Sequence, residues 1–303
     1  MKNLEKIFGR VAIPMITPFD ESSEVDCDKA CLLAERLIER QYCDSIILSG
    51  TNGEFHSLGY SERVALFEAV QSLQGKIPLV AGTGACTTQE TILLTRKAES
   101  LGYDAAMVVP PYFGTPTQDE LFSHYSEVAE AVTIPIVLYN IPVFTGVNIE
   151  PKTTSRLAEI QNIIGIKDEA ALHPLQSSEV FASIPADKDF AVYCGDDTMT
   201  LQVLVQGGSG VVSGGSHVVG DLMKEMIERF FTGNVNQATR LHKIIYRFAG
   251  ALTPGSRVNP VPLTKAALAL TGFDAGIPRK PFLPPSKEET ENLQQTLEAI
   301  GKL

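Results

Sequence analysis

The sequence predicts an α/β fold, a (β/α)8 TIM barrel with a helical extension at its C-terminal end. Short runs rich in β-branched residues recur eight times along the chain, and amphipathic segments typical of helices alternate with them. The runs are apolar on both faces, as in a parallel sheet covered by helices. The units follow one another evenly and no G-x-G-x-x-G follows the first run, which favours a closed barrel over an open doubly wound sheet.

Each element can be placed by its own signals. The expected strands are 11–19, 45–50, 78–84, 105–111, 135–142, 163–169, 190–197 and 210–216. The clearest expected helices between them are 26–41, 61–73, 87–101 and 117–132. Thr87 and Thr117 each precede a glutamate by three residues, which predicts capping boxes at two of these helices.

The strand pattern ends near residue 216, and helical stretches follow over 234–252, 262–271 and 287–300. We therefore expect a catalytic barrel over residues 1–232 and a C-terminal helical appendage over 233–303.

Composition excludes several classes of function. The 303 residues carry a net charge of −11, which argues against binding a nucleic-acid backbone. The five cysteines include no C-x-x-C and histidine is sparse, so we expect neither a metal site nor disulfides. The chain has no run of about 18 apolar residues and no signal-peptide pattern, so we expect a cytoplasmic protein without membrane contact.

Lys167 stands out because it directly follows the apolar run 163–166, at the end of a strand where barrels carry their chemistry. The other lysines occupy helical, loop or terminal stretches where we expect their ammonium groups to reach water. A buried amine spends more time neutral, and a neutral amine forms an imine with a carbonyl. The alternative is a structural lysine in an ion pair with Asp168, Glu169 or another carboxylate at the rim of the barrel. Asp168 is a poor partner because strand alternation points it to the opposite face.

Two neighbouring strand ends add polar groups. Tyr139 falls at an equivalent height on the fifth strand, where its hydroxyl could carry protons, although an isolated tyrosine is more often a core residue. The second strand runs into Gly50-Thr51-Asn52-Gly53-Glu54, a composition suited to a tight turn that holds a carboxylate, or to an ordinary loop. Together these features describe a site for an α-keto acid.

The chain resembles the dihydrodipicolinate synthase / N-acetylneuraminate lyase family of class I, pyruvate-handling lyases. The resemblance runs through nearly the whole chain and rests on GTNGE (50–54), PPYF (110–113), YNIPVFTG (139–146), GIKD (165–168), CGDD (194–197), GVVS (210–213) and NPVP (259–262).

The resemblance implies roles for several residues. Lys167 would form the Schiff base, Tyr139 would donate and accept protons, and Thr51 would join the proton relay. Asn52 would hold the substrate carboxylate, mainly through its backbone N–H. Gly195 and Val212 would line the pyruvate pocket. It also implies no organic cofactor or metal, and a homo-oligomer, a tetramer or dimer, in which the segment containing Phe113 reaches a neighbouring site.

Two positions depart from the family pattern. Phe144 stands where dihydrodipicolinate synthases carry an arginine that grips the carboxylate of aspartate semialdehyde, and Phe113 replaces the relay tyrosine. We therefore expect a pyruvate-dependent class I aldolase that cleaves or forms a 2-keto-3-deoxy sugar acid or related 4-hydroxy-2-keto acid, with a neutral or hydroxylated aldehyde as partner. The alternatives are true dihydrodipicolinate synthase and a non-catalytic sensor of pyruvate or sugar acids.

Overall fold

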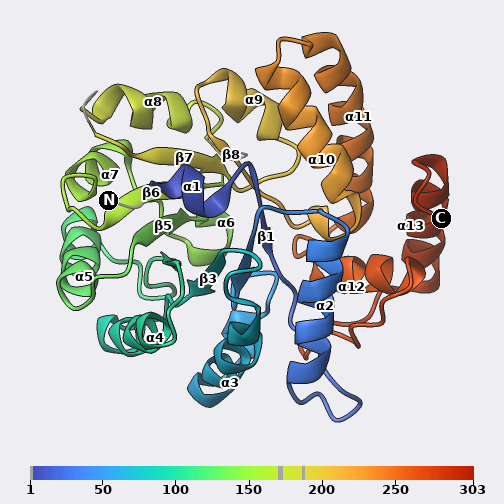
Figure 1. Ribbon diagram of the computed structural model, residues 1–303, viewed down its shortest axis with the longest axis horizontal. Coiled ribbons are helices and arrows are strands. Elements are labelled where there is room, and N and C mark those ends of the chain that lie inside the picture. Colours follow the sequence, from blue (N-terminus) through green and yellow to red (C-terminus); the bar gives the residue numbers. More distant parts are fainter. Residues whose placement is uncertain (1–2, 170–172, 186–187) are drawn as a thin grey trace. The chain divides into compact units, whose positions relative to one another are not determined.

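The computed structural model describes residues 3–169, 173–185 and 188–303. Its eight strands follow one another in the order of a closed parallel barrel, and the chain ends in helices, so the predicted fold class is confirmed (Figure 1). The strands are β1 (Val11–Pro14), β2 (Ser45–Leu48), β3 (Leu79–Gly82), β4 (Ala105–Val108), β5 (Ile136–Asn140), β6 (Ile163–Asp168), β7 (Ala191–Cys194) and β8 (Gly210–Val212). Every residue of these strands is buried, as the apolar runs predict.

A helix lies at each of the seven predicted helical ranges, and four more helices of at least six residues lie in described stretches for which no range was predicted. Together these are α2 (Cys27–Glu39), α3 (Tyr60–Val70), α4 (Thr88–Ser100), α5 (Gln118–Glu130), α7 (Pro151–Leu157), α8 (Gln176–Ser183), α9 (Thr200–Val205), α10 (Ser216–Phe231), α11 (Val235–Leu252), α12 (Val261–Leu270) and α13 (Lys287–Ala299). The capping box predicted at Thr117 is present, with Glu120 returning a bond to the Thr117 N–H. At Thr87 only half of the predicted box is present: Thr87 caps α4 by accepting from the Glu90 N–H, but the Glu90 side chain returns no bond to the Thr87 N–H.

By compactness the chain divides into two units, and we describe each by itself. The first comprises residues 3–10 and 78–212, with strands β3 to β8 and the helices α4, α5, α7, α8 and α9 around them (Figure 1). A short helix that the sequence analysis did not predict, α1 (Leu4–Phe8), also belongs to it. Leu4 packs against Gly165 and the Phe8 ring meets the edge of Tyr193, with ring centroids 5.1 Å apart. A side chain at Gly165 is excluded because its Cβ would lie 2.6 Å from the Ala191 backbone carbonyl, in addition to meeting Leu4.

The second unit comprises residues 11–77 and 213–303. It holds β1 and β2, which pair in parallel, together with α2, α3 and the helices α10 to α13. Helices α10, α11, α12 and α13 pack on one another. The predicted boundary near residue 232 falls between α10 and α11, but this compact unit extends across it, so the proposed domain division stays a prediction.

One expectation about lysines is wrong. Lys265 lies on α12 and is only 2% exposed, so its ammonium does not reach water. The sequence analysis missed this because it inspected strand ends, whereas α12 is a helix whose residues are nearly all buried. No helix within the described ranges combines the length and apolar character needed to cross a membrane.

Candidate active site

Lys167 and Tyr139 face each other across neighbouring strands. They are register partners in the parallel pairing of β6 with β5, as their equivalent heights predict. Both are buried, with Lys167 4% and Tyr139 2% exposed. The Lys167 Nζ lies 3.9 Å from the centroid of the Tyr139 ring. Among the described residues no carboxylate forms an ion pair with Lys167, and the face of the Tyr139 ring lies within cation–π distance of its nitrogen.

A buried polar network lies on the other face of the same strands. The Asn140 Nδ2 donates to Asp168 Oδ1 at 2.9 Å and to Asn148 Oδ1 at 2.8 Å, while Gln176 Nε2 of α8 donates to Asp168 Oδ1 at 3.0 Å. Burial raises the pKa of Asp168, and the bonds from Asn140 and Gln176 work in the opposite direction. Asp168 therefore points away from Lys167, as strand alternation predicts, and its bonds tie together the two strands that present Tyr139 and Lys167.

The loop after β7 places Gly195 beside Lys167. The Gly195 N–H donates to the Asp168 carbonyl at 2.7 Å, which continues the β6–β7 pairing past the strand end. A Cβ on Gly195 would lie 2.8 Å from Lys167 Cε and 2.8 Å from Glu169 Oε2. A side chain at position 195 would therefore force Lys167 and Glu169 to shift, and the glycine leaves both side chains where they are. Val212 ends β8 and is 1% exposed.

Thr51 and Asn52 belong to the second unit, in the tight turn that follows β2. The Glu54 N–H donates to the Thr51 carbonyl at 3.0 Å, which closes the turn. Asn52 is 8% exposed, and its Nδ2 is buried without a hydrogen-bond partner in the described part of the chain. This Nδ2 lies against Gly214, where a Cβ would collide with it. The composition predicted a tight turn over Gly50–Glu54, and the structure has a tight turn there.

Glu54, the last residue of this turn, anchors it through buried polar contacts. It adopts a left-handed backbone conformation with φ 55°, and its side chain is fully buried. The Lys265 Nζ pairs with Glu54 Oε1 at 2.9 Å, and the Arg279 N–H donates to Oε2 at 2.9 Å. The Lys265 Nζ also lies 4.1 Å from the centre of the Phe19 ring. Two residues of the C-terminal region thus position the Gly50–Glu54 turn.

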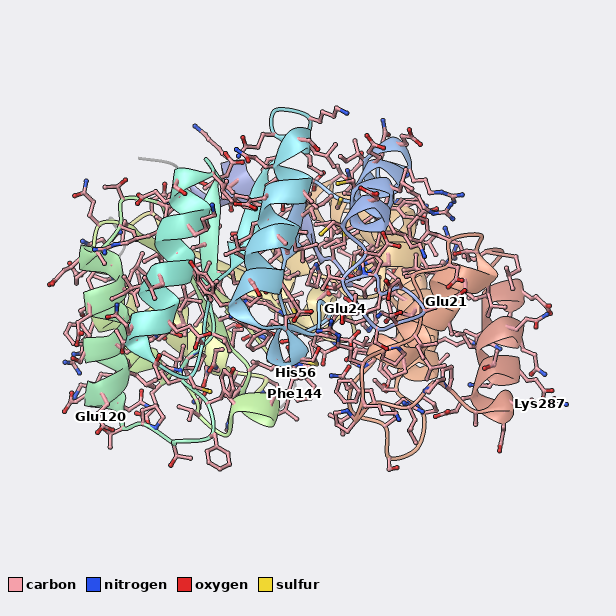
Figure 2. All side chains as sticks on the ribbon, turned by 90° about the horizontal axis from the view of Figure 1, so that it is seen from below. Glu21, Glu24, His56, Glu120, Phe144 and Lys287 are labelled. Carbon is pink, nitrogen blue, oxygen red and sulfur yellow. The ribbon has the colours of Figure 1, made fainter. Side chains whose placement is uncertain are left out.

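Phe144 and Phe113 are the least enclosed of the predicted site residues. Phe144 lies on the four-residue helix α6 (Pro142–Thr145) directly after β5 and is 42% exposed (Figure 2). Phe113 is 96% exposed and has a φ of 71°, which is unusual for an aromatic residue. Neither side chain offers a charge or a hydroxyl.

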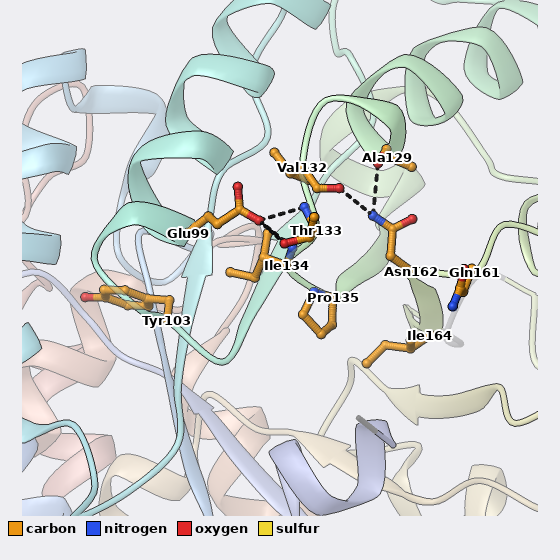
Figure 3. A pocket seen from close by; sticks show the side chains of 10 residues that line it. All are labelled: Glu99, Tyr103, Ala129, Val132, Thr133, Ile134, Pro135, Gln161, Asn162 and Ile164. Atoms are coloured by element: carbon orange, nitrogen blue, oxygen red, sulfur yellow. Dashed lines mark hydrogen bonds between the residues drawn. The ribbon is translucent and has the colours of Figure 1, made fainter. Parts of the chain in front are cut away.

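A separate cavity of about 670 Å³ opens at the other end of the strands, among residues that precede β4, β5 and β6 (Figure 3). Its polar groups already bond to one another. Glu99 accepts from Thr133 and from the Ile134 N–H, and Asn162 donates to two carbonyls. Barrels carry their chemistry at the opposite, C-terminal ends of the strands, so this cavity is no candidate for the active site.

Glu169 directly follows β6, and the only role considered for it from the sequence is that of an ion-pair partner of Lys167. Strand alternation places it on the same face as Lys167, two residues earlier, and that spacing was a signal available in the sequence. Burial raises the pKa of its carboxyl to about 8, Lys167 opposes this rise, and Asp196, Asp197 and Asp168 add to it.

Comparison with known proteins decides the family. Residues 7–300 match the model of the dihydrodipicolinate synthetase family. The chain belongs to this family. It is 41% identical to 4-hydroxy-tetrahydrodipicolinate synthase 1 of Halalkalibacterium halodurans over 289 residues, which cover 94% of this chain and 95% of that protein. The synthase of Moorella thermoacetica is 40% identical, covering 98% of this chain and 99% of that protein.

Solved structures of the family agree with the fold. A dihydrodipicolinate synthase of Bacillus anthracis superposes with a TM-score of 0.91 at 38% identity, covering 96% of this chain and 98% of that one. The enzyme of Acinetobacter baumannii, crystallised in complex with pyruvate, gives a TM-score of 0.89 at 33% identity, covering 98% of this chain and all of that one. The chain is therefore a pyruvate-using lyase of the class I aldolase type, in a family that works through a lysine Schiff base without a cofactor. The sensor hypothesis is set aside.

Proposed function

We propose that the chain condenses pyruvate with aspartate semialdehyde, the reaction of a 4-hydroxy-tetrahydrodipicolinate synthase. The support is the name shared by relatives 38–41% identical over nearly the full chain. This is the alternative that the sequence analysis ranked second. Similarity over the whole length carries more weight for the reaction than two substituted positions do.

Lys167 is the proposed Schiff-base residue. The observation that carries this assignment is a buried lysine that lies over the Tyr139 ring and has no ion pair within the described residues. Its amine adds to the keto carbon of pyruvate, water leaves, and the resulting iminium withdraws electrons so that C3 becomes nucleophilic as an enamine. The enamine attacks the aldehyde, and Tyr139 exchanges protons with the oxygens involved.

The remaining site residues take roles around this imine. We propose Thr51 as a member of the proton relay and Asn52 as the holder of the substrate carboxylate. The unpartnered Nδ2 of Asn52 supports a ligand contact, because a buried donor without a partner is costly unless something else satisfies it. Gly195 gives the lysine room, and Val212 contributes an apolar wall.

A second candidate is favoured by Phe144 and Phe113. An aspartate semialdehyde site needs a partner for a second carboxylate, and an arginine would grip it through two parallel hydrogen bonds that a phenyl ring cannot make. The aldehyde of a 2-keto-3-deoxy sugar acid has hydroxyl groups instead of that carboxylate. An aldolase for such a sugar acid, or for a related 4-hydroxy-2-keto acid, is therefore the second function to test.

The test measures turnover of pyruvate with aspartate semialdehyde and, in parallel, with short hydroxylated aldehydes. A value of kcat/KM at least tenfold higher for aspartate semialdehyde supports the first function, and the reverse order supports the second. Phe144→Arg sharpens the result. If Phe144 sets the preference, the variant gains activity with aspartate semialdehyde, whereas no gain removes this position from the account of selectivity.

We also propose that the chain assembles as a homo-oligomer, a tetramer or a dimer. Phe113 supports this, since an aromatic side chain that is 96% exposed in one chain has apolar surface left to bury. Light scattering coupled to gel filtration measures the mass directly. Phe113→Ser is expected to lower the measured mass or weaken the assembly. If wild type and Phe113→Ser both have the mass of a single chain, the proposal is refuted.

A further inference from the structure

Glu169 is a titratable side chain at the candidate site that the mechanism above does not use. Its backbone N–H donates to the Asn140 carbonyl at 3.0 Å, so the pairing of β6 with β5 continues one residue past Asp168. Side chains two residues apart on a strand point to the same face. Glu169 therefore lies on the face that carries Lys167, whereas Asp168 between them joins the buried network with Asn140 and Gln176.

The space between Glu169 and Lys167 is defined by Gly195. The Cβ that Gly195 lacks would meet Glu169 Oε2 and Lys167 Cε at the same distance, 2.8 Å. Both side chains thus border one small volume beside the lysine. Within the described residues the two side chains form no direct ion pair, so neither one is held by the other.

The charges around Glu169 favour its neutral form. The positive charge of Lys167 acts on it in one direction, while Asp196 and Asp197 from the loop after β7 and Asp168 from its own strand repel a negative charge. Burial acts in the same direction and is the largest influence, so the pKa of this carboxyl reaches about 8. At neutral pH Glu169 therefore holds a proton that it can donate, which an ordinary glutamate does not.

We propose that Glu169 is the general acid that expels water during formation of the Schiff base on Lys167. The inference rests on the proposed function, because it assigns a step of that same imine chemistry. It does not depend on which aldehyde reacts later, since the step precedes the aldehyde.

The step balances as follows. The neutral Lys167 amine adds to the keto carbon of pyruvate, and a proton moves from nitrogen to oxygen to give a carbinolamine. Glu169 donates its proton to the carbinolamine hydroxyl, the C–O bond breaks, water leaves, and the nitrogen lone pair forms the C=N bond of the iminium. When the product imine is hydrolysed, the Glu169 carboxylate takes a proton from the attacking water, so one full turnover restores the acid.

The experiment follows this half-reaction with pyruvate alone. The full-length protein is mixed with pyruvate, quenched with borohydride at increasing times, and the reduced adduct is counted by intact mass. Glu169→Gln keeps the size of the side chain and removes the acid, so we expect imine formation to slow by about 10²-fold while the final adduct still forms. Glu130→Gln, at an exposed position near the end of α5, is the matched control and is expected to keep the wild-type rate.

The pH dependence separates acid catalysis from a structural effect. The rate ratio of wild type to Glu169→Gln, measured at each pH, reports the effect of the carboxyl. We expect this ratio to be largest below about pH 8 and to fall as the pH rises through the pKa of Glu169. In Glu169→Ala, added formic or acetic acid buffers are expected to restore part of the rate in proportion to the concentration of the acid form.

Two outcomes would overturn the inference, and a third would overturn the proposed function beneath it. Equal rates for wild type and Glu169→Gln across the pH range would remove Glu169 from the step. A slow Glu169→Gln whose ratio to wild type does not change with pH, with no rescue of Glu169→Ala, would mean a structural role. If wild type itself forms no adduct with pyruvate, the proposed Schiff-base function fails. This outcome differs from the first two, in both of which wild type forms the adduct.

Discussion

Two buried lysines in this chain have similar surroundings and different partners. Lys167 on β6 and Lys265 on α12 are 4% and 2% exposed, and each nitrogen lies about 4 Å from the centre of an aromatic ring. Lys265 also has the buried carboxylate of Glu54 at 2.9 Å and the Ile277 carbonyl at 3.2 Å. Lys167 has no ion pair within the described residues. Burial alone therefore does not identify a reactive lysine, and the lack of a fixed anionic partner is the feature that supports the proposed role of Lys167.

The difference has a physical reason. A carboxylate in direct contact holds an ammonium in its charged form and occupies its hydrogen-bonding directions. Burial lowers the pKa of Lys265, but Glu54 acts against this, and its coulombic attraction and hydrogen bond favour the charged form. An amine held as an ammonium cannot attack a carbonyl. Lys265 accordingly anchors the turn that carries Thr51 and Asn52, whereas Lys167 has no such partner within the described residues and is the lysine proposed to react.

The largest expected effect concerns Lys167→Met, which keeps the length of the side chain and removes the amine. We expect turnover to fall by at least about 10³-fold because no nucleophile remains. Since no ion pair breaks, the free energy of unfolding should change by less than about 1.5 kcal/mol. Steady-state kinetics and a urea titration measure the two quantities. A large loss of stability would mean that Lys167 is structural after all.

Lys265→Met should show the opposite pattern. Removing one partner of a buried pair leaves Glu54 charged and unpaired, which costs about 3–5 kcal/mol of stability. The double variant Lys265→Met/Glu54→Gln is expected to recover part of that loss, as a double-mutant cycle would show by urea titration. Equal stability of Lys265→Met and wild type would contradict the contrast between the two lysines.

Gly195→Ala changes the surroundings of Lys167 and leaves those of Lys265 as they are. The new Cβ would press on Lys167 Cε and Glu169 Oε2, so the amine must shift by a fraction of an ångström. A displacement of that kind at a reacting group is expected to lower kcat/KM by about 10²-fold. Circular dichroism is expected to be unchanged. Wild-type kinetics for this variant would show that the space beside Lys167 is not used.

A smaller effect is expected on stability as a function of pH. The pKa of Glu169 rises from an ordinary value of 4.5 to about 8 on folding, so the folded state binds a proton more tightly than the unfolded state. The stability that the protonated Glu169 gives the folded state is fully present below about pH 4.5 and is lost as the pH rises through 8. Glu169→Gln should therefore unfold at a higher temperature than wild type at pH 8 and show a smaller difference at pH 5. Identical melting curves at both values would contradict the shifted pKa.

Much of the fold was predictable because repeated local signals agreed. Eight apolar runs, the spacing of the helices between them and the cap at Thr117 all pointed to the same barrel. The register of Tyr139 with Lys167 and the outward direction of Asp168 followed from strand alternation. Lys265 was missed because its partner Glu54 is 211 residues earlier in the sequence, and no local pattern links a helix lysine to a turn glutamate. The raised pKa of Glu169 likewise depends on burial and on charges from a different loop.

The most direct test of this account is to incubate the protein with pyruvate and borohydride and then locate the adduct by peptide mapping. The account predicts one reduced pyruvate per chain, on the peptide containing Lys167, and none on the peptide containing Lys265. No adduct, or an adduct on Lys265, would contradict it.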